Sequence, residues 1–352
     1  MTRAAGSDGT AKVAFIGGVG RSGTTLLALA LGNIAGCAAV GELHWIWERG
    51  LVRNELCGCG AHFRECAFWS KVGVEAFGGW DKVDAEELRD RRHELLGLRN
   101  VPLSFVSRAG SAYEQRLVDY AAHMQRLYLA IRAVSNCDVI VDSSKAAAAA
   151  LLLGRMRLDP YLIHLARDSR GVVFSWSRHV VRPEVTDEVT YMGRRSTTRA
   201  AVGWVVRNTA LHVVGRSAVP RLLVTYEAFV ASPLSEMGRI VDFLGLSPEP
   251  DLSFLDGGAL PVTPMHTVAG NPLRFRHGTM PIRCDEEWRQ RMARGDRMLV
   301  SALTWPLELA YRPSRNGRRV HDRAGPVAAE GAAPRPPRAS RAPARQRSRR
   351  ET

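Results

Sequence analysis

Residues 13–35, VAFIGGVGRSGTTLLALALGNIA, contain an apolar strand, a glycine-rich turn and a leucine-rich helix that begins near Thr24. In such a strand–turn–helix, the backbone N–H groups of the turn and of the first helical turn point toward one bound anion. A turn that only packs tightly is the alternative, and the run of hydroxyl side chains disfavours it. The predicted anion-binding residues are Gly20, Arg21, Ser22, Gly23, Thr24 and Thr25.

The same turn departs from the loop of ATP-binding proteins at one position. From Gly18 to Gly23 its spacing fits the pattern GxxxxGK[ST], but Thr24 stands where that pattern has lysine. Arg21 is the only cation of the turn. The sequence therefore predicts a site for a phosphate-like group and disfavours ATP bound with magnesium.

The chain has 352 residues, enough for one large or two ordinary domains, and 45% of them are hydrophobic. Its formal charge is +14, but residues 313–352 hold 11 Arg and 3 acidic side chains, so +8 lies in this tail and +6 on the body. A moderately positive body suits an anionic ligand without indicating nucleic acid.

The composition of the two ends differs from that of the body. Residues 1–11 and the Arg-, Pro- and Ala-rich residues 313–352 cannot build a core and are predicted to be disordered, which leaves 12–312 as the folded domain. The tail lacks aromatic residues, so a solvated tail is favoured over one that binds nucleic acid or anionic lipid.

No stretch of the sequence reaches the roughly 18–20 uninterrupted apolar residues that span a bilayer. The apolar run from Val13 is interrupted by glycines and by Arg21, which indicates a strand and loop and not a signal peptide. No membrane span is expected, and cytoplasmic placement is the default.

β-Branched runs alternate with helical patterns along the body, which is typical of an α/β fold with a largely parallel sheet. Expected strands are 12–17, 137–141, 161–165 and 221–224, with one more before Glu42. Expected helices are 24–35, 85–96, 112–134, 146–157, 170–178, 199–215, 234–244 and 285–303.

The polar clusters GGVGRSGTT, DSSK and ARDSR each follow a strand. Because open α/β sheets bind ligands at the carboxyl ends of their strands, we expect these clusters to converge.

A second candidate phosphate site lies in the segment HLARDSRGVVFSWSR. Arg167 follows an expected strand, and Ser175 comes eight residues later on the next helix. A guanidinium at the strand end and a hydroxyl two turns into the helix can hold one phosphate from two sides.

Two charged residues at other strand ends are candidates for chemistry. Glu42 lies 21 residues after Arg21, just past a short apolar stretch. Lys145 ends the cluster DSSK. In that cluster, Ser143 and Ser144 either line the site or cap the following helix, and capping is favoured.

In this order and spacing, the residues resemble the sulfotransferases that use 3′-phosphoadenosine-5′-phosphosulfate (PAPS). RSGTT is similar to their 5′-phosphosulfate loop, and Arg167 with Ser175 is similar to their 3′-phosphate site. The distance from Arg21 to Glu42 is similar to that in the tyrosylprotein branch, in which a glutamate here is the proposed base. The pieces CGCGAHFRECAFW, VDSSK, TYEAFVASP and AGNPLRF are similar to a bacterial branch, and the resemblance spans residues 12–305.

The resemblance implies a P-loop-like fold whose mostly parallel central sheet, of about five strands, is flanked by helices. It also implies transfer of a sulfuryl group from PAPS to an acceptor hydroxyl, or less readily to an amine, with no metal required. Glu42 would accept the hydroxyl proton, while Arg21 and Lys145 stabilise the developing charge. Further nucleotide contacts are implied at Tyr226, Gly270 and Arg274, with a core tyrosine or a structural salt bridge as the alternatives.

The sequence also departs from the family pattern. The catalytic histidine of the cytosolic enzymes has no counterpart in VDSSK, which places the base role on Glu42, and Ala146 replaces a proline found in some relatives. A P-loop nucleotide kinase that uses ATP and magnesium remains as an alternative. So does a nucleotide- or nucleic-acid-binding protein without catalysis. The sequence carries no signature of the acceptor or of the oligomeric state.

Cys57, Cys59 and Cys66 cluster around His62. The CxC spacing lacks the CxxC pair usual in structural zinc sites, so zinc, a disulfide and free thiols all stay open, with thiols favoured in a reducing cytoplasm. Four tryptophans in the same region either build an apolar acceptor pocket or belong to the core, and the core is favoured. They are Trp45, Trp47, Trp69 and Trp80.

Overall fold

The computed structural model describes residues 10–97, 100–102, 111–186, 189–217 and 219–311. The tail expected at 313–352 lies outside these residues. So does the lead expected at 1–11, except for Thr10 and Ala11, and Ala11 is buried in the core. Among the helices of the described part of the chain, none is both long and apolar enough to cross a bilayer.

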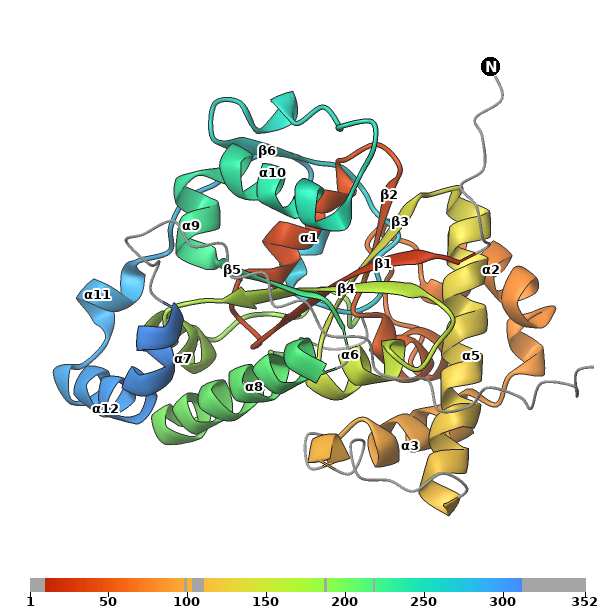
Figure 1. Cartoon of the computed structure of the whole chain (residues 1–352), viewed down its shortest axis with the longest axis horizontal. Helices are drawn as coiled ribbons and strands as arrows, with labels where there is room; N and C mark the ends of the chain where they lie inside the picture. The colour runs from red at the N-terminus through yellow and green to blue at the C-terminus, as the bar shows by residue number, and fades with distance from the viewer. Residues whose placement is uncertain (1–9, 98–99, 103–110, 187–188, 218, 312–352) are drawn as a thin grey trace, which may run out of the picture.

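A five-stranded sheet in the order β2-β3-β1-β4-β5 forms the centre of the molecule (Figure 1). All of its strand pairs are parallel, which confirms the predicted α/β class. The strands are β1 (Lys12–Gly18), β2 (Cys37–Gly41), β3 (Val139–Lys145), β4 (Asp159–Ala166) and β5 (Arg221–Thr225). A separate antiparallel pair consists of β6 (Ala259–Val262) and β7 (Gly278–Pro281).

The α-helices of the described residues follow most of the predicted ranges. They are α1 (Thr24–Gly32), α2 (Ala67–Phe77), α3 (Ala85–Leu95), α5 (Ala112–Ser135), α6 (Ala147–Leu153), α7 (Ser169–Ser177), α8 (Thr197–Ser217), α9 (Tyr226–Ala231), α10 (Pro233–Leu244), α11 (Glu287–Arg291) and α12 (Arg294–Tyr311). The sequence did not predict α2 and α9. The single helix expected at 285–303 is wrong, since α11 and α12 are separate. Met292 divides them because its backbone is extended and its side chain is buried with Trp288.

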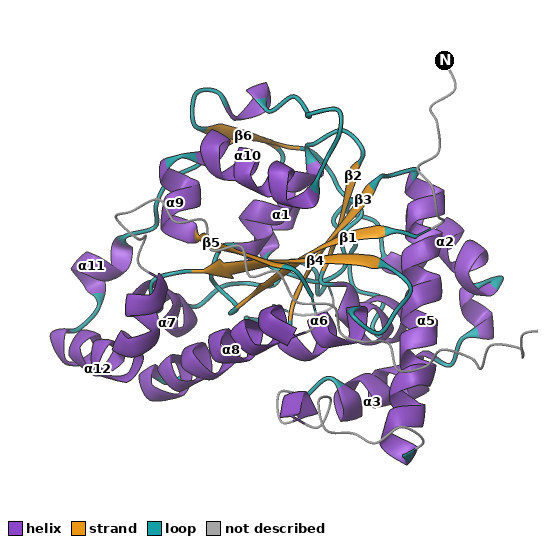
Figure 2. Cartoon of the chain, in the orientation of Figure 1, coloured by secondary structure: helices purple, strands orange, loops and turns teal. Residues whose placement is uncertain are grey.

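β1 shows why the sheet is buried on both faces. Val13 and Phe15 point to one face and Ala14 and Ile16 to the other, as the period of two requires for a strand. In Figures 1 and 2, α1, α9 and α10 cover the face of Ala14, while α5, α6 and α8 lie on the opposite face. A strand covered on both faces is apolar at every position, which explains the continuous run VAFI.

The strand order creates a crevice beside β1. From β1 the chain adds β2 and β3 on one side, and later adds β4 and β5 on the other. A strand at which the order reverses leaves a crevice at the carboxyl end of the sheet. Gly17 of β1 pairs with Lys145 of β3, and Gly18 pairs with Leu165 of β4. The three polar clusters therefore meet at this edge, as predicted.

His164 of β4 gives the fold a pH dependence. Its ring is fully buried, with Nε2 at 2.9 Å from the side-chain oxygen of Asn208 and Nδ1 at 3.3 Å from the guanidinium of Arg221. Burial lowers the pKa of His164 to about 3. The native ring therefore stays neutral at a pH where the same ring in the unfolded chain has already taken up a proton.

This difference is expected to destabilise the native state as the pH falls below about 6.5. Because the unfolded chain binds the extra proton, the free energy of unfolding should fall by about 2 kcal/mol from this group between about pH 7.5 and about pH 5. Urea unfolding of wild type and His164→Gln at both pH values measures the effect, with the exposed His277→Gln as control. An equal loss of stability in wild type and His164→Gln would contradict the prediction.

Candidate active site

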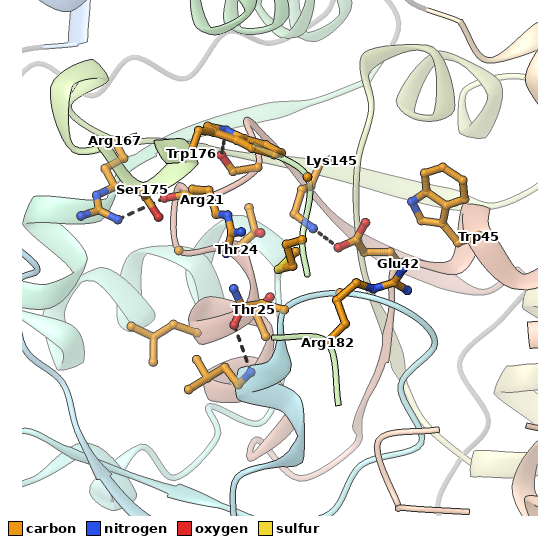
Figure 3. Close-up of a pocket in the computed structure, with 18 of the residues that line it drawn as sticks. Arg21, Thr24, Thr25, Glu42, Trp45, Lys145, Arg167, Ser175, Trp176 and Arg182 are labelled. Carbon is orange, nitrogen blue, oxygen red and sulfur yellow. Dashed lines mark hydrogen bonds and ion pairs between the residues drawn. The ribbon is translucent and has the colours of Figure 1, made fainter. Parts of the chain in front are cut away.

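A cavity of about 540 Å³ opens at the carboxyl ends of the central strands. Figure 3 shows Arg167 and Ser175 at one end of it, Glu42 and Trp45 at the other, and the β1–α1 turn between them. The predicted site residues that line this cavity are Gly20, Arg21, Gly23, Thr24, Thr25, Glu42, Lys145, Arg167, Ser175, Tyr226 and Gly270. The fold thus brings together residues from distant segments of the chain.

The β1–α1 turn presents backbone donors to the cavity. Gly23 is the N-cap of α1 with φ at 91°, and no side chain caps the helix. The N–H groups of the first helical turn, at Thr24 and Thr25, have no intrahelical acceptor and lie at the positive end of the helix dipole. A Cβ at position 23 would lie 2.6 Å from the Tyr226 ring, so both the backbone and its neighbour require glycine. The turn suits a phosphate or sulfate group.

The half-buried guanidinium of Arg21 lines the same cavity. Its Nε and Nη2 atoms are buried and have no hydrogen-bond partner among the described residues. The guanidinium lies 5.4 Å from the centre of the Trp176 ring. Burial is the main cause that lowers the pKa of Arg21, Arg178 lowers it further, and Glu42 opposes both. A buried guanidinium with open donors is a strong site for an anion.

Arg167 and Ser175 lie together at one end of the cavity. The Arg167 guanidinium donates to the backbone oxygens of Arg21 at 3.1 Å and Asp285 at 2.9 Å. It also pairs with the Asp285 carboxylate at 3.2 Å and lies 4.5 Å from the Tyr226 ring centre. Ser175 lies on α7 at the same end of the cavity (Figure 3). Arg167 therefore connects this end of the cavity to the β1–α1 turn, and a phosphate bound there would compete with Asp285 for the guanidinium.

Glu42 and Lys145 form an ion pair at the other side of the cavity (Figure 3). Glu42 directly follows β2 and Lys145 ends β3, so two neighbouring parallel strands bring the side chains together. Their side chains are 14% and 16% exposed, respectively. A carboxylate held at the cavity wall in this way can accept a proton from a hydroxyl group placed in the cavity.

A buried polar network holds the backbone next to Glu42. The Asp142 carboxylate accepts the N–H of Leu43 at 3.3 Å, and the Ser144 hydroxyl accepts that of His44 at 3.1 Å. Asp142 also accepts the N–H of Ser144 at 2.8 Å. Asp142 and Ser144 therefore position the turn that carries Glu42.

The expected capping of the next helix by Ser143 or Ser144 is wrong. The N-cap of α6 is Ala146, and no side chain bonds to the helix end. β3 extends through Lys145 and keeps both serines in the sheet, where Ser144 serves the Glu42 turn.

The model of the sulfotransferase family matches residues 14–250, which include the β1–α1 turn, Arg167, Ser175 and the pair of Glu42 and Lys145. The chain belongs to the sulfotransferase family. The match confirms the resemblance that the sequence motifs indicated.

Two solved structures are similar to this sulfotransferase-family chain. The sulfotransferase domain from the curacin biosynthetic pathway is 17% identical with a TM-score of 0.45, over 86% of this chain and 98% of that domain. The sulfotransferase domain from the Synechococcus PCC 7002 olefin synthase is 18% identical with a TM-score of 0.42, over 86% and 97%. No curated protein matches the chain.

Two predicted nucleotide contacts of this sulfotransferase lie outside the lining of the large cavity. Ser22 is fully buried within the turn. Arg274 is 2% exposed, and its guanidinium donates to the backbone oxygens of Thr267 at 2.6 Å and Leu56 at 2.9 Å. Burial lowers the pKa of Arg274 to about 10. The Arg274 side chain thus connects two segments of the sulfotransferase that are far apart in sequence.

Sequence reasoning missed other cavity residues of the sulfotransferase. Trp176 donates its indole N–H to the backbone oxygen of Gly20 at 3.1 Å and so supports the anion-binding turn. Arg182 lines the cavity while paired with Glu55 at 2.9 Å and Glu184 at 3.1 Å. Trp176 stands next to Ser175, but its partner Gly20 is far away in sequence. Arg182 lies in no motif, and its partner Glu55 is distant, although Glu184 is close in sequence. Only the tertiary structure therefore shows that both residues line the cavity.

The tryptophans of the sulfotransferase divide between site and core. Trp45 lines the cavity, as the acceptor-pocket alternative expected. Trp47 and Trp69 are fully buried core residues, and Trp80 packs at the edge of the same core. The core prediction therefore holds for these three, and Trp45 packs against the same core while it also lines the cavity.

Positive charge dominates the lining of the large cavity. Among the described residues it contains six basic and three acidic side chains: Arg21, Arg49, Arg53, Lys145, Arg167 and Arg182, with Glu42, Glu48 and Asp285. Such an excess raises the local concentration of polyanions. The cavity of this sulfotransferase is therefore suited to a ligand with several negative charges.

A second cavity of about 310 Å³ adjoins the first and contains a histidine that sequence reasoning did not select. His44 lines it, and burial, followed by Arg92, Lys145 and Arg49, lowers the pKa of His44 well below its usual value. Its Nδ1 is buried and has no partner within the described ranges. A neutral imidazole therefore lies two residues after Glu42. The residues that line both cavities are Gly20, Glu42, Trp45, Lys145 and Trp176.

Proposed function

We propose that the chain transfers a sulfuryl group from PAPS to the hydroxyl group of an acceptor. The observation that carries this proposal is the half-buried Arg21 side chain, which lines the same cavity as the free N-terminus of α1 and whose Nε and Nη2 atoms have no partner among the described residues. Arg167 and Ser175, which we propose as the holders of a second anion, line the same cavity. Members of the sulfotransferase family generally use PAPS, whose 5′-phosphosulfate and 3′-phosphate groups need two such sites.

The residues suggest a division of roles in the transfer. Glu42 takes the proton of the acceptor hydroxyl as its oxygen forms a bond to sulfur, and the bond from sulfur to the 5′-phosphate oxygen breaks. The nucleotide then leaves as 3′-phosphoadenosine-5′-phosphate (PAP). Arg21 and the N–H groups of Thr24 and Thr25 stabilise the negative charge on the leaving oxygen. Lys145 holds Glu42 in place and adds positive charge.

A nucleotide kinase is the other enzyme class that the turn admits, and two residues argue against it. Thr24 supplies no ammonium group for the phosphates of ATP. Asp142, the carboxylate near the end of β3, is 1% exposed and accepts hydrogen bonds from Tyr128, Leu43 and Ser144. Its oxygens are therefore occupied and do not offer a ligand to magnesium. Sulfuryl transfer needs no such magnesium ligand, because a sulfuryl group carries less charge than a phosphoryl group.

Arg167→Ala is expected to weaken PAP binding by roughly 10- to 150-fold, since a charge-assisted contact to the 3′-phosphate is lost. Isothermal titration calorimetry of PAP, and separately of ATP with magnesium, measures this for wild type and variant. Arg170→Ala is the matched control, because Arg170 pairs with Asp168 beside the site and does not line the cavity. Its PAP affinity should equal that of wild type.

Ser175→Ala should weaken PAP binding by about 5-fold, in line with one lost hydrogen bond. This variant leaves the contacts of Arg167 intact and separates ligand loss from misfolding. Tighter binding of ATP with magnesium than of PAP, or unchanged PAP affinity in Arg167→Ala, would overturn the assignment and favour the kinase.

A further inference from the structure

Residues 57–66, which precede α2, contain a tight turn and three cysteines. Cys57 donates its N–H to the Ala61 oxygen at 2.8 Å, and its own oxygen accepts the N–H of Gly60 at 2.8 Å. Cys59 lies within this turn, and Cys66 ends the segment as the N-cap of α2. The three thiols are thus held on one short, hydrogen-bonded piece of backbone.

The fourth member of the cluster comes from the other end of the domain. His266 directs Nδ1 at the Cys66 sulfur, at 3.2 Å. The sulfur atoms of Cys57, Cys59 and Cys66 and a ring nitrogen of His266 all lie within 4.8 Å of one another. The sulfurs of Cys59 and Cys66 are 3.7 Å apart. With Zn–S bonds of about 2.3 Å at the tetrahedral angle, two thiolates lie about 3.8 Å apart.

The residues around the cluster allow the cysteine segment and the segment of His266 to lie close together. Gly58 donates its N–H to Thr267 at 3.0 Å, and a Cβ on Gly58 would lie 2.5 Å from the Met265 oxygen. Only glycine lets the segment that carries His266 come so close. The His266 ring stacks on Phe68 with 4.8 Å between ring centres and 10° between planes, which fixes the ring orientation.

We propose that Cys57, Cys59, Cys66 and His266 bind one structural Zn²⁺ ion. Three thiolates and one imidazole are a ligand set typical of closed tetrahedral zinc sites, which leave no position for water or substrate. None of these four residues lines the cavity of about 540 Å³, so we assign the ion no part in sulfuryl transfer. Binding releases the thiol protons to solvent and consumes no oxidant.

The ion would connect residues 57–66 to the segment of His266, which lies against the backbone of Glu42. Val268, two residues after His266, accepts the N–H of Glu42 at 2.7 Å and donates to Val40 at 2.8 Å. Arg274 bonds the same two segments through Thr267 and Leu56. Loss of zinc is therefore expected to lower the thermal stability of the chain, in proportion to the binding energy lost.

The test is the metal content of the full chain, purified under reducing conditions from cells supplied with zinc and measured by mass spectrometry. We expect about one zinc per chain in wild type and almost none in Cys59→Ser and Cys66→Ser. His266→Ala changes an exposed side chain and should fold, but its zinc affinity, measured by competition with a chelator, should fall by more than about 10-fold. Replacement of zinc by Co²⁺ should give the visible absorption of a tetrahedral thiolate site.

His62→Ala and Cys284→Ser are the matched controls and should retain one zinc. His62 lies inside the cysteine segment, but its Nδ1 contacts the Asn54 oxygen at 2.9 Å instead of the thiols. Cys284 is an exposed thiol outside the cluster. Absence of zinc from wild type, a Cys59–Cys66 disulfide in the purified chain, or equal losses in His62→Ala and His266→Ala would each overturn the proposal.

Discussion

Replacement of Glu42 by glutamine is expected to lower kcat by about 10²–10⁴-fold, because the amide cannot take the proton of the acceptor hydroxyl. Glutamine has nearly the size of glutamate and can still accept a hydrogen bond from Lys145, so the turn should keep its shape. PAP affinity should stay close to that of wild type, since Glu42 lies at the end of the cavity away from Arg167 and Ser175. Conversion of PAPS to PAP, with a hydroxyl acceptor found by screening the wild type, measures kcat, and calorimetry measures PAP binding.

Glu48→Gln is the control for this variant. Glu48 also lines the cavity, but it pairs with Arg53 at 2.6 Å and with His93 at 3.1 Å instead of with Lys145. Its kcat should remain near that of wild type. If Glu42→Gln retains full activity while His44→Gln loses it, the neutral imidazole is the base and the role assigned to Glu42 is wrong. A chain that binds PAP without any turnover in wild type would instead point to a non-catalytic nucleotide-binding protein.

Replacement of Arg21 by glutamine is expected to lower kcat by about 10²–10³-fold, the usual cost of removing one preorganised donor from a developing negative charge. The effect should be larger on kcat than on PAP affinity, because charge on the bridging oxygen grows in the transition state. Arg21→Lys should recover part of the activity, since it restores the charge without the planar donor pair.

Arg178→Gln is the matched control for Arg21→Gln. Arg178 lowers the pKa of Arg21 through its charge, but its own guanidinium pairs with Glu287 at 2.9 Å and does not line the cavity. Both variants therefore remove one positive charge from the same region. Equal losses of kcat in the two variants would show that Arg21 acts only through long-range electrostatics. That result would contradict the proposed contact with the leaving oxygen.

Most of the cavity lining around the β1–α1 turn and Arg167 could be predicted from sequence because each part is local. The strand, turn and helix around Arg21 are continuous in the chain, and the eight residues from Arg167 to Ser175 span one strand end and one helix. Ser22 and Arg274 show the limit of such reasoning, since a motif position does not tell whether a side chain reaches the cavity or bonds to the backbone. Trp176 and Arg182 were missed because their contacts with Gly20 and Glu55 join segments that are far apart in sequence.

The sequence by itself determined the α/β class, the glycine-rich turn between β1 and α1 and the order of the motifs, because periodicity, glycine positions and short spacings act through neighbouring residues. Only the tertiary structure decided which side chains meet. Glu42 and Lys145 form a pair because β2 and β3 are adjacent in the sheet. His266, and not the nearby His62, completes the cysteine cluster because the chain returns to it after 200 residues. Such contacts depend on strand order and on long-range packing, which no local pattern encodes.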